Sequence, residues 1–251
     1  MMKKWKKTTL GRSEQLERTV SAAQDAVAAT PLGHPDRAQR LSNLEESLRA
    51  RYDATGSVAD LDAVIGVEQD LVGAIAVGHP DRAPMLSNLG LSLNTRYERA
   101  GDVSDLNAAI AAFRGAAAAT TFDHPKRQNY LSNLGHRLFA RYAQFEDVGD
   151  LNAAIIAFRG AAAATPLGHP DRAAHLWNLG SSLQARYDAT GKVRDLDAVI
   201  LAAGEAAANT PHDHPDRQKY LSNFDNSLRT RSERFGDFPD EFGVLATLRG
   251  S

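Results

Sequence analysis

The chain has 251 residues, a formal net charge of −2 and no cysteine. The lack of cysteine excludes disulfides, thiolate metal ligands and cysteine nucleophiles, and it fits a reducing compartment, so we expect a cytoplasmic protein. No excess of positive charge favours nucleic acid or an acidic membrane surface as a partner, and no apolar run approaches the roughly 20 residues of a membrane span.

A long internal repeat dominates the sequence. The dipeptide His-Pro recurs in steps of 45 residues, without an insertion, at His34, His79, His124, His169 and His214. An unbroken period of this length is typical of stacked repeats, in which each unit packs only on its neighbours. We therefore expect one repeat domain rather than two globular domains.

The segment before the first His-Pro reads as half of a repeat. Residues 1–11 are basic, and we expect them to form a disordered tail. Residues 12–30 carry apolar side chains at helical spacing, from Leu16 to Val27, and their register matches the second helix of the later repeats. The repeat domain is thus expected to span residues 12–251 and to open on an unpaired helix.

Each full repeat predicts two helices, here called A and B. Helix A begins at His-Pro, because proline is tolerated in the first turn of a helix, and it ends near a glycine that can adopt the left-handed conformation. Helix B follows at once and is rich in alanine, a strong helix former. The repeats are expected at residues 34–76, 79–120, 124–165, 169–210 and 214–250.

Several positions inside the repeat carry specific expectations. One apolar stripe runs along helix A, so equivalent buried sites are predicted for Leu89, Leu134 and Leu179. Glu146 replaces the glycine that ends helix A, so the turn of the third repeat is expected to differ.

The start of helix B resembles a capping box. An oxygen-bearing residue precedes an aspartate by three positions, as in Ser57 and Asp60 or in Asp102 and Asp105. Lys192 breaks this pattern in the fourth repeat.

Two periodic sets of side chains could carry chemistry. The five histidines in register invite a metal site, but neighbouring repeats lie about 10 Å apart while zinc ligands lie at about 2 Å from one ion, so we interpret them as residues of the turns. The arginine series that begin at Arg37 and Arg51 could bind anions, but pairing with the periodic aspartates that begin at Asp60 is the favoured interpretation. No glycine-rich phosphate loop, Ser-His-Asp order or HExxH motif is present. We expect no catalytic residue, no cofactor and no metal site.

The sequence resembles the tetratricopeptide repeat (TPR). The resemblance rests on Leu-Ser-Asn-Leu-Gly at residues 86–90 and 131–135, on the helix–turn–helix unit and on the alanine-rich second helix. The longer period and the His-Pro-Asp-Arg opening resemble a variant that often occurs beside CHAT protease domains or signalling ATPase domains. The resemblance implies an all-α, right-handed solenoid that acts as a non-catalytic scaffold and binds a protein or peptide on the concave face lined by the A helices.

The resemblance also implies a binding site. The asparagine that holds the ligand backbone in peptide-binding members corresponds to Asn43, Asn88, Asn133, Asn178 and Asn223, of which the central three, Asn88, Asn133 and Asn178, are the predicted binding residues. Groove positions where the third and fourth repeats depart from the others add His136, Phe139 and Trp177. Aromatic anchors contribute much of the binding energy at interfaces. The alternative, that Phe139 and Trp177 fill the space between adjacent A helices, is equally open.

Two other functions stay open. A site in the central groove could bind a small molecule or support catalysis, which buried polar groups with shifted pKa values would indicate. The chain could instead be a structural module for self-assembly. Solenoids need polar end repeats, yet the C-terminal segment carries Phe242, Val244, Leu245 and Leu248. We therefore expect either truncation from a longer chain or end-to-end homo-oligomers.

Overall fold

The structure, a computed structural model, describes residues 2–236, with side chains from residue 11 onward. This part of the chain is helical and contains no strand. The A helices are α2 (Arg37–Thr55), α4 (Arg82–Ala100), α6 (Arg127–Phe145), α8 (Asp171–Thr190) and α10 (Arg217–Phe235). The B helices are α1 (Met2–Ala28), α3 (Val58–Ala74), α5 (Val103–Ala118), α7 (Val148–Ala164) and α9 (Val193–Ala208).

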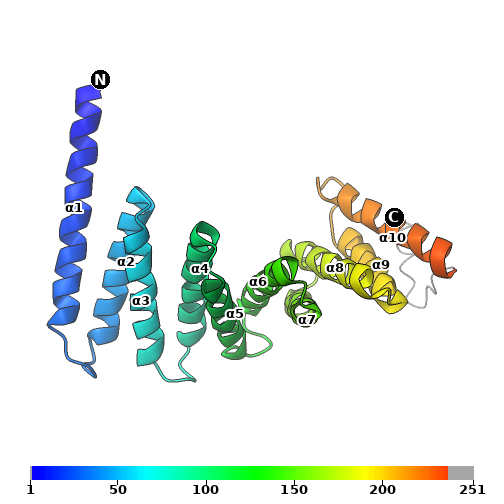
Figure 1. Ribbon diagram of the computed structural model, residues 1–251, viewed down its shortest axis with the longest axis horizontal. Helices are drawn as coiled ribbons and strands as arrows, with labels where there is room; N and C mark the ends of the chain where they lie inside the picture. Colours follow the sequence, from blue (N-terminus) through cyan, green and yellow to red (C-terminus); the bar gives the residue numbers. More distant parts are fainter. Residues whose placement is uncertain (1, 237–251) are drawn as a thin grey trace. The chain divides into compact units, whose positions relative to one another are not determined.

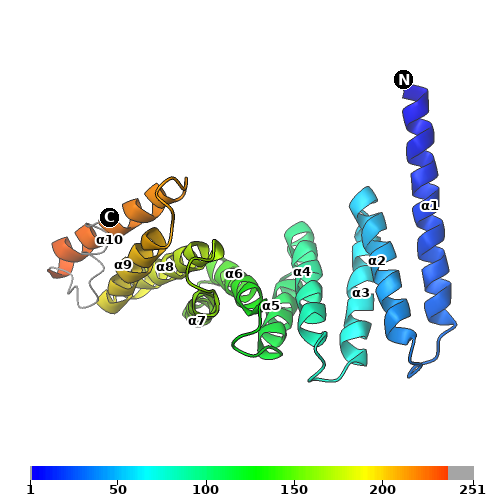
Figure 2. The same ribbon diagram turned by 180° about the vertical axis from the view of Figure 1, so that it is seen from behind.

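The chain forms two compact units, Met1–Ala119 and Thr120–Ser251. In the first unit α1 to α5 pack in chain order, each on the next, and in the second unit α6 to α10 do the same (Figures 1 and 2). Both units are thus built from stacked helical hairpins, as expected for an all-α solenoid. A single domain over residues 12–251 stays a prediction.

At the N-terminus α1 begins at Met2 and so includes the basic residues, and a disordered tail over residues 1–11 stays a prediction. Lysine is a good helix former, and no proline separates these residues from the apolar part of the helix. The expected last B helix and the apolar residues from Phe242 to Leu248 lie outside the described residues.

The apolar stripe of helix A lies in the core of each unit. Leu89, Leu134 and Leu179 are 9%, 7% and 7% exposed, which confirms that they occupy equivalent buried sites. The B helices bury small residues in the same cores, where Ala109 and Ala154 are fully buried. The absence of bulk at these positions lets the two helices of a repeat approach closely.

The turn from helix A to helix B is the same in the first four repeats. Gly56, Gly101 and Gly191 are left-handed, and the backbone N–H of each lies 2.7 Å from a tyrosine carbonyl one turn earlier. Glu146 adopts the same conformation with φ of 56° and makes the same bond to Tyr142. The expected difference in this turn was therefore wrong, since the repeat geometry overrides the preference for glycine.

The start of helix B is capped, but only in part as expected. Ser57 Oγ accepts a hydrogen bond from the N–H of Asp60 at 3.3 Å. Asp102 Oδ1 instead accepts from the N–H of Ser104 at 2.9 Å. The carboxylates of Asp60 and Asp105 do not complete a capping box, because each binds an arginine of the preceding A helix.

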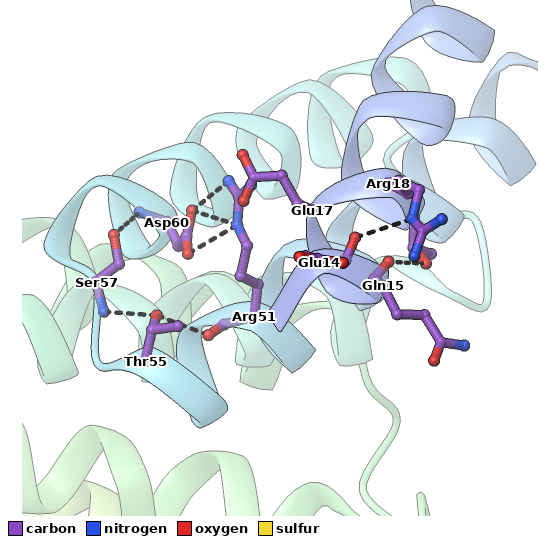
Figure 3. Close-up of polar contacts among 9 residues, drawn as sticks. Glu14, Gln15, Glu17, Arg18, Arg51, Thr55, Ser57 and Asp60 are labelled. Atoms are coloured by element: carbon purple, nitrogen blue, oxygen red, sulfur yellow. Dashed lines mark hydrogen bonds and ion pairs between the residues drawn. The ribbon is translucent and has the colours of Figure 1, made fainter. Parts of the chain in front are cut away.

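These arginines connect two B helices. Arg51 binds Asp60 on α3 at 2.6 Å and Glu17 on α1 at 3.2 Å (Figure 3). Arg96 repeats the arrangement with Asp105 at 2.6 Å and Asp62 at 2.8 Å. In the second unit, the fourth repeat uses Arg186, with Asp195 and Asn152. The predicted ion pairing of this series is confirmed.

The other arginine series has a different role, so its predicted pairing with the same aspartates was wrong. Arg82 Nη1 donates to the carbonyls of Val72 and Ile75, both at 3.0 Å, at the end of the preceding B helix. Arg172 does the same with Ala162 at 2.6 Å and Thr165 at 2.8 Å. The last carbonyls of a helix lack intrahelical partners and carry partial negative charge, which explains the placement of a cation there.

The periodic histidines form the turns that precede the A helices, as interpreted from the sequence. In each repeat the histidine Nδ1 accepts a hydrogen bond from the backbone N–H two residues later, at 3.1 Å for His34 and 3.2 Å for His169. His79, His124 and His214 make the equivalent bond. An accepting Nδ1 carries no proton, so the neutral ring has its proton on Nε2.

Candidate functional site

The predicted binding residues lie on the side of the A helices that is open to solvent. Asn88 on α4 is exposed, and it belongs to the first unit. Asn133 on α6 and Asn178 on α8 are half-buried in the second unit. The residues that can form one continuous site are therefore those of the second unit.

Two of the predicted residues meet between α6 and α8. Asn178 Nδ2 lies 3.3 Å from His136 Nε2, and the amide can donate when this nitrogen carries no proton. The His136 ring also packs edge-on against Phe158 of α7, with the ring centroids 5.1 Å apart. His136 is exposed and Asn178 half-buried, so the contact between them is within reach of a partner.

Trp177 connects α8 to α10. Its ring lies 5.6 Å from that of Tyr220, and it packs on a buried cluster that includes Leu176 and Ala206. The Nζ of Lys219 lies 3.9 Å from the centroid of the Trp177 ring, close enough for a cation–π contact. The structure thus gives Trp177 a packing role between two A helices and leaves it half-buried.

Phe139 is not brought together with the other aromatic residues. It is half-buried, and the ring near it is that of Tyr142 on the same helix, at 6.2 Å between centroids. Lys219 was missed by the sequence reasoning. The available signal was a break in the period, because the equivalent positions hold uncharged residues, namely Gln39, Pro84, Asn129 and Ala174.

Amide and hydroxyl side chains recur on the open side of the A helices in the second unit. Amide side chains can donate and accept at once, which suits the backbone of an extended peptide. Within the described part of the chain, the side chains of Asn133 and Asn223 make no hydrogen bond, so their amide groups are available to a partner. The hydroxyl and amide groups of this face belong to Ser132, Asn133, Asn178, Ser181, Ser222 and Asn223.

A buried charged network lies in the first unit. Arg49 on α2 donates to Glu68 Oε1 on α3 at 2.7 Å, to Glu45 at 2.7 Å and to Ser92 on α4 at 3.1 Å. Glu68 is 3% exposed, and its second carboxylate oxygen has no partner. Burial raises the pKa of Glu68 to about 7, against the opposing effects of Ser92 and Arg49.

A buried histidine lies in the second unit. His175 on α8 is 6% exposed, and neither ring nitrogen has a hydrogen-bond partner. Burial lowers its pKa, because the protonated ring would lose its hydration. The equivalent positions of the neighbouring repeats hold the buried residues Tyr130 and Tyr220, so this is a packing position of helix A.

The described residues offer no metal centre, since no three or more of their histidine or acidic side chains come together as ligands. A cleft of about 760 Å³ lies at the loop edge of the second unit, lined by residues such as His212, His214 and Arg217. Two of these already have structural roles, because His214 accepts from the backbone N–H of Asp216 and Arg217 donates to the carbonyl of Ala207. In the part of the chain described here, no helix is both long and apolar enough to cross a membrane.

No protein-family model matches the chain, and no curated protein matches its sequence. Among solved structures, it is similar to a crystal structure from Podospora anserina of nearly identical TPR-like repeats, in a protein described as a kinesin light chain. The TM-score is 0.54 at 16% sequence identity, over 85% of this chain and 95% of that one. The chain therefore has the fold of a TPR-like helical-repeat solenoid.

Proposed function

We propose that the protein is a non-catalytic scaffold that binds an extended segment of a partner protein on the A helices of its second unit. The observation that best supports this proposal is the row of side-chain amides on α6, α8 and α10. Asn133 and Asn223 are not used by packing, and Asn178 contributes only a contact to the exposed His136. Trp177 and Lys219 border this row and offer apolar and charged contacts.

The two most buried groups with shifted pKa values do not form one site. Buried ionisable residues such as Glu68 and His175 would indicate a catalytic groove if they came together. They belong to different units, and each is buried within its own unit. The long period and the His-Pro-Asp-Arg opening further suggest the TPR variant that accompanies CHAT protease or ATPase domains, and we propose a cytoplasmic location.

A displayed random-peptide library, selected on the full chain, tests the proposal. The affinity of a recovered peptide is then measured for a variant that combines Asn133→Ala, Asn178→Ala and Asn223→Ala. Each lost hydrogen bond costs about 0.5–1.5 kcal/mol, so the triple variant is expected to bind at least about tenfold more weakly.

The matched control is Ile156→Ala on α7, which removes a side chain that is 70% exposed on a B helix. This variant should bind as the parent does. Equal binding by the triple variant would exclude the amide row, and a concentration-dependent mass without peptide binding would favour self-assembly.

A further inference from the structure

A groove lies between the B helices α7 and α9, with α8 at its base. Its volume is about 580 Å³. Four basic side chains line it, together with one acidic side chain, Asp195. The basic residues are Arg159 on α7, Arg186 on α8, and Lys192 and Arg194 at the start of α9. The groove is not part of the amide row described above.

Most of this positive charge is unpaired. Asp195 is taken by Arg186, whose Nη2 lies 2.6 Å from the carboxylate. Arg159, Lys192 and Arg194 are exposed, and none of them makes a hydrogen bond or ion pair through its side chain with another residue in the described part of the chain. The groove therefore offers an unbalanced positive charge from both of its walls.

The repeat scaffold does not require these cations. The equivalent positions of the first unit, on α3, α4 and α5, keep the pair of Arg96 and Asp105. The positions that correspond to the three unpaired cations hold an amide, a carboxylate and a hydroxyl there, namely Gln69, Asp102 and Ser104. The same ion pair is thus formed in this chain without the three extra positive charges.

Lys192 is also unfavourable for its own helix. It occupies the N-cap of α9 and makes no capping hydrogen bond, whereas Asp102 and Asp147 cap α5 and α7. A cation at this end opposes the helix dipole, and loss of a capping side chain costs about 1 kcal/mol. A residue that lowers helix stability where an acidic one would raise it is best explained by a role in binding.

We propose that this groove binds an acidic peptide segment of a partner protein that also carries apolar side chains. The basic side chains come from more than one helix and do not converge on one point. This arrangement suits a peptide that carries several carboxylates along its length. Val148, Leu183, Val193 and Ala198 line the groove between them and supply an apolar surface. This surface would be a second docking site, separate from the amide row.

The test measures the binding of a fluorescent synthetic peptide of alternating glutamate and leucine to the full chain. The variant combines Lys192→Asp with Arg194→Ser, which installs the residues of the second repeat. Binding is expected to weaken at least about tenfold and to lose most of its salt dependence. The melting temperature should hold or rise because the substitution restores a cap.

Two controls complete the design. Arg114→Ser removes an exposed cation from α5 in the first unit and should leave binding unchanged. A lysine–leucine peptide should not bind the parent. The proposal is overturned if the double variant binds the acidic peptide normally, if Arg114→Ser weakens binding equally, or if inorganic phosphate displaces the peptide completely at low concentration and so reveals a small-anion site.

The proposals for the two sites can be tested independently of each other. Asn178→Ala should not alter binding of the acidic peptide, and the double variant should not alter binding of a peptide held by the amide row. Loss of both activities in either variant would contradict two separate sites.

Discussion

Gly90 on α4 and Phe113 on α5 are so close that a Cβ on the glycine would lie 2.8 Å from the ring. The third repeat contains the same pair, with 2.7 Å between a Cβ on Gly135 and the Phe158 ring. Both rings are almost fully buried. The phenylalanine ring therefore requires a residue without a Cβ opposite it, and the pair determines how closely helix A packs on helix B.

Gly135→Ala is expected to lower the free energy of unfolding by about 1–3 kcal/mol, because the added methyl group overpacks a buried ring. Chemical denaturation monitored by circular dichroism measures the change. Gly180→Ala is the matched control, since the nearest atom to its Cβ would be 3.8 Å away. This control should be neutral or stabilising by up to about 1 kcal/mol, as alanine favours helix. Equal losses in the two variants would contradict the close contact.

Glu68→Gln is expected to remove a pH dependence of stability. The raised pKa of about 7 means that the folded state holds this proton more tightly than the unfolded state, whose carboxyl has the ordinary value of 4.5. The parent should thus lose stability as the pH rises from 4.5 through 7, by about 1–3 kcal/mol. The glutamine variant should show a flatter profile in urea titrations across this range. Glu46→Gln, at an exposed position on the neighbouring helix α2, should keep the parent slope.

His175→Tyr is expected to protect the second unit from acid. The lowered pKa means that the unfolded state binds the proton more readily, so the parent should lose stability as the pH falls through the ordinary histidine value of 6.5. Tyrosine fits this position in Tyr130 and Tyr220, and it does not ionise there near neutral pH. Thermal melts at pH 7.5 and 5.5 measure the difference. His212→Gln, at an exposed position, should leave the acid sensitivity intact.

Trp177→Ser is expected to lower the free energy of unfolding by about 1.5–3 kcal/mol, less than for a fully buried tryptophan, because the ring is half-buried against Tyr220. Serine is the residue at this position in the other four repeats. Circular dichroism melts measure the loss. An unchanged melt together with lost peptide binding would instead make Trp177 a binding residue rather than a packing residue.

Periodicity predicted most of the fold, because a repeated position must meet the same environment in every repeat. The register of Leu89, Leu134 and Leu179 followed from spacing alone. The role of Arg82 did not, because its partners are backbone carbonyls at the end of a helix and leave no side-chain pattern in the sequence. The aspartates that recur with the same period suggested the wrong partner for this series.

The candidate sites depend on residues that break the period, and these are harder to interpret. Glu45 and Glu68 occupy the positions of Gly90 and Phe113, so a charged network replaces an aromatic contact in the first repeat. Sequence shows the two substitutions but not that they compensate each other through Arg49. Likewise, Lys192 is visible as a broken cap, whereas its place in a groove beside Arg159 depends on how α7 and α9 pack.

The arginine contacts make the repeats tolerant of changes in their number. Arg96 reaches back to Asp62 and forward to Asp105, and Arg186 reaches back to Asn152 and forward to Asp195. Because donor and acceptors recur with the same period, excision or duplication of one whole period joins an arginine to acceptors of the same kind wherever the chain is cut. Recombination between copies of the gene segment can therefore lengthen or shorten such an array without breaking this arginine network.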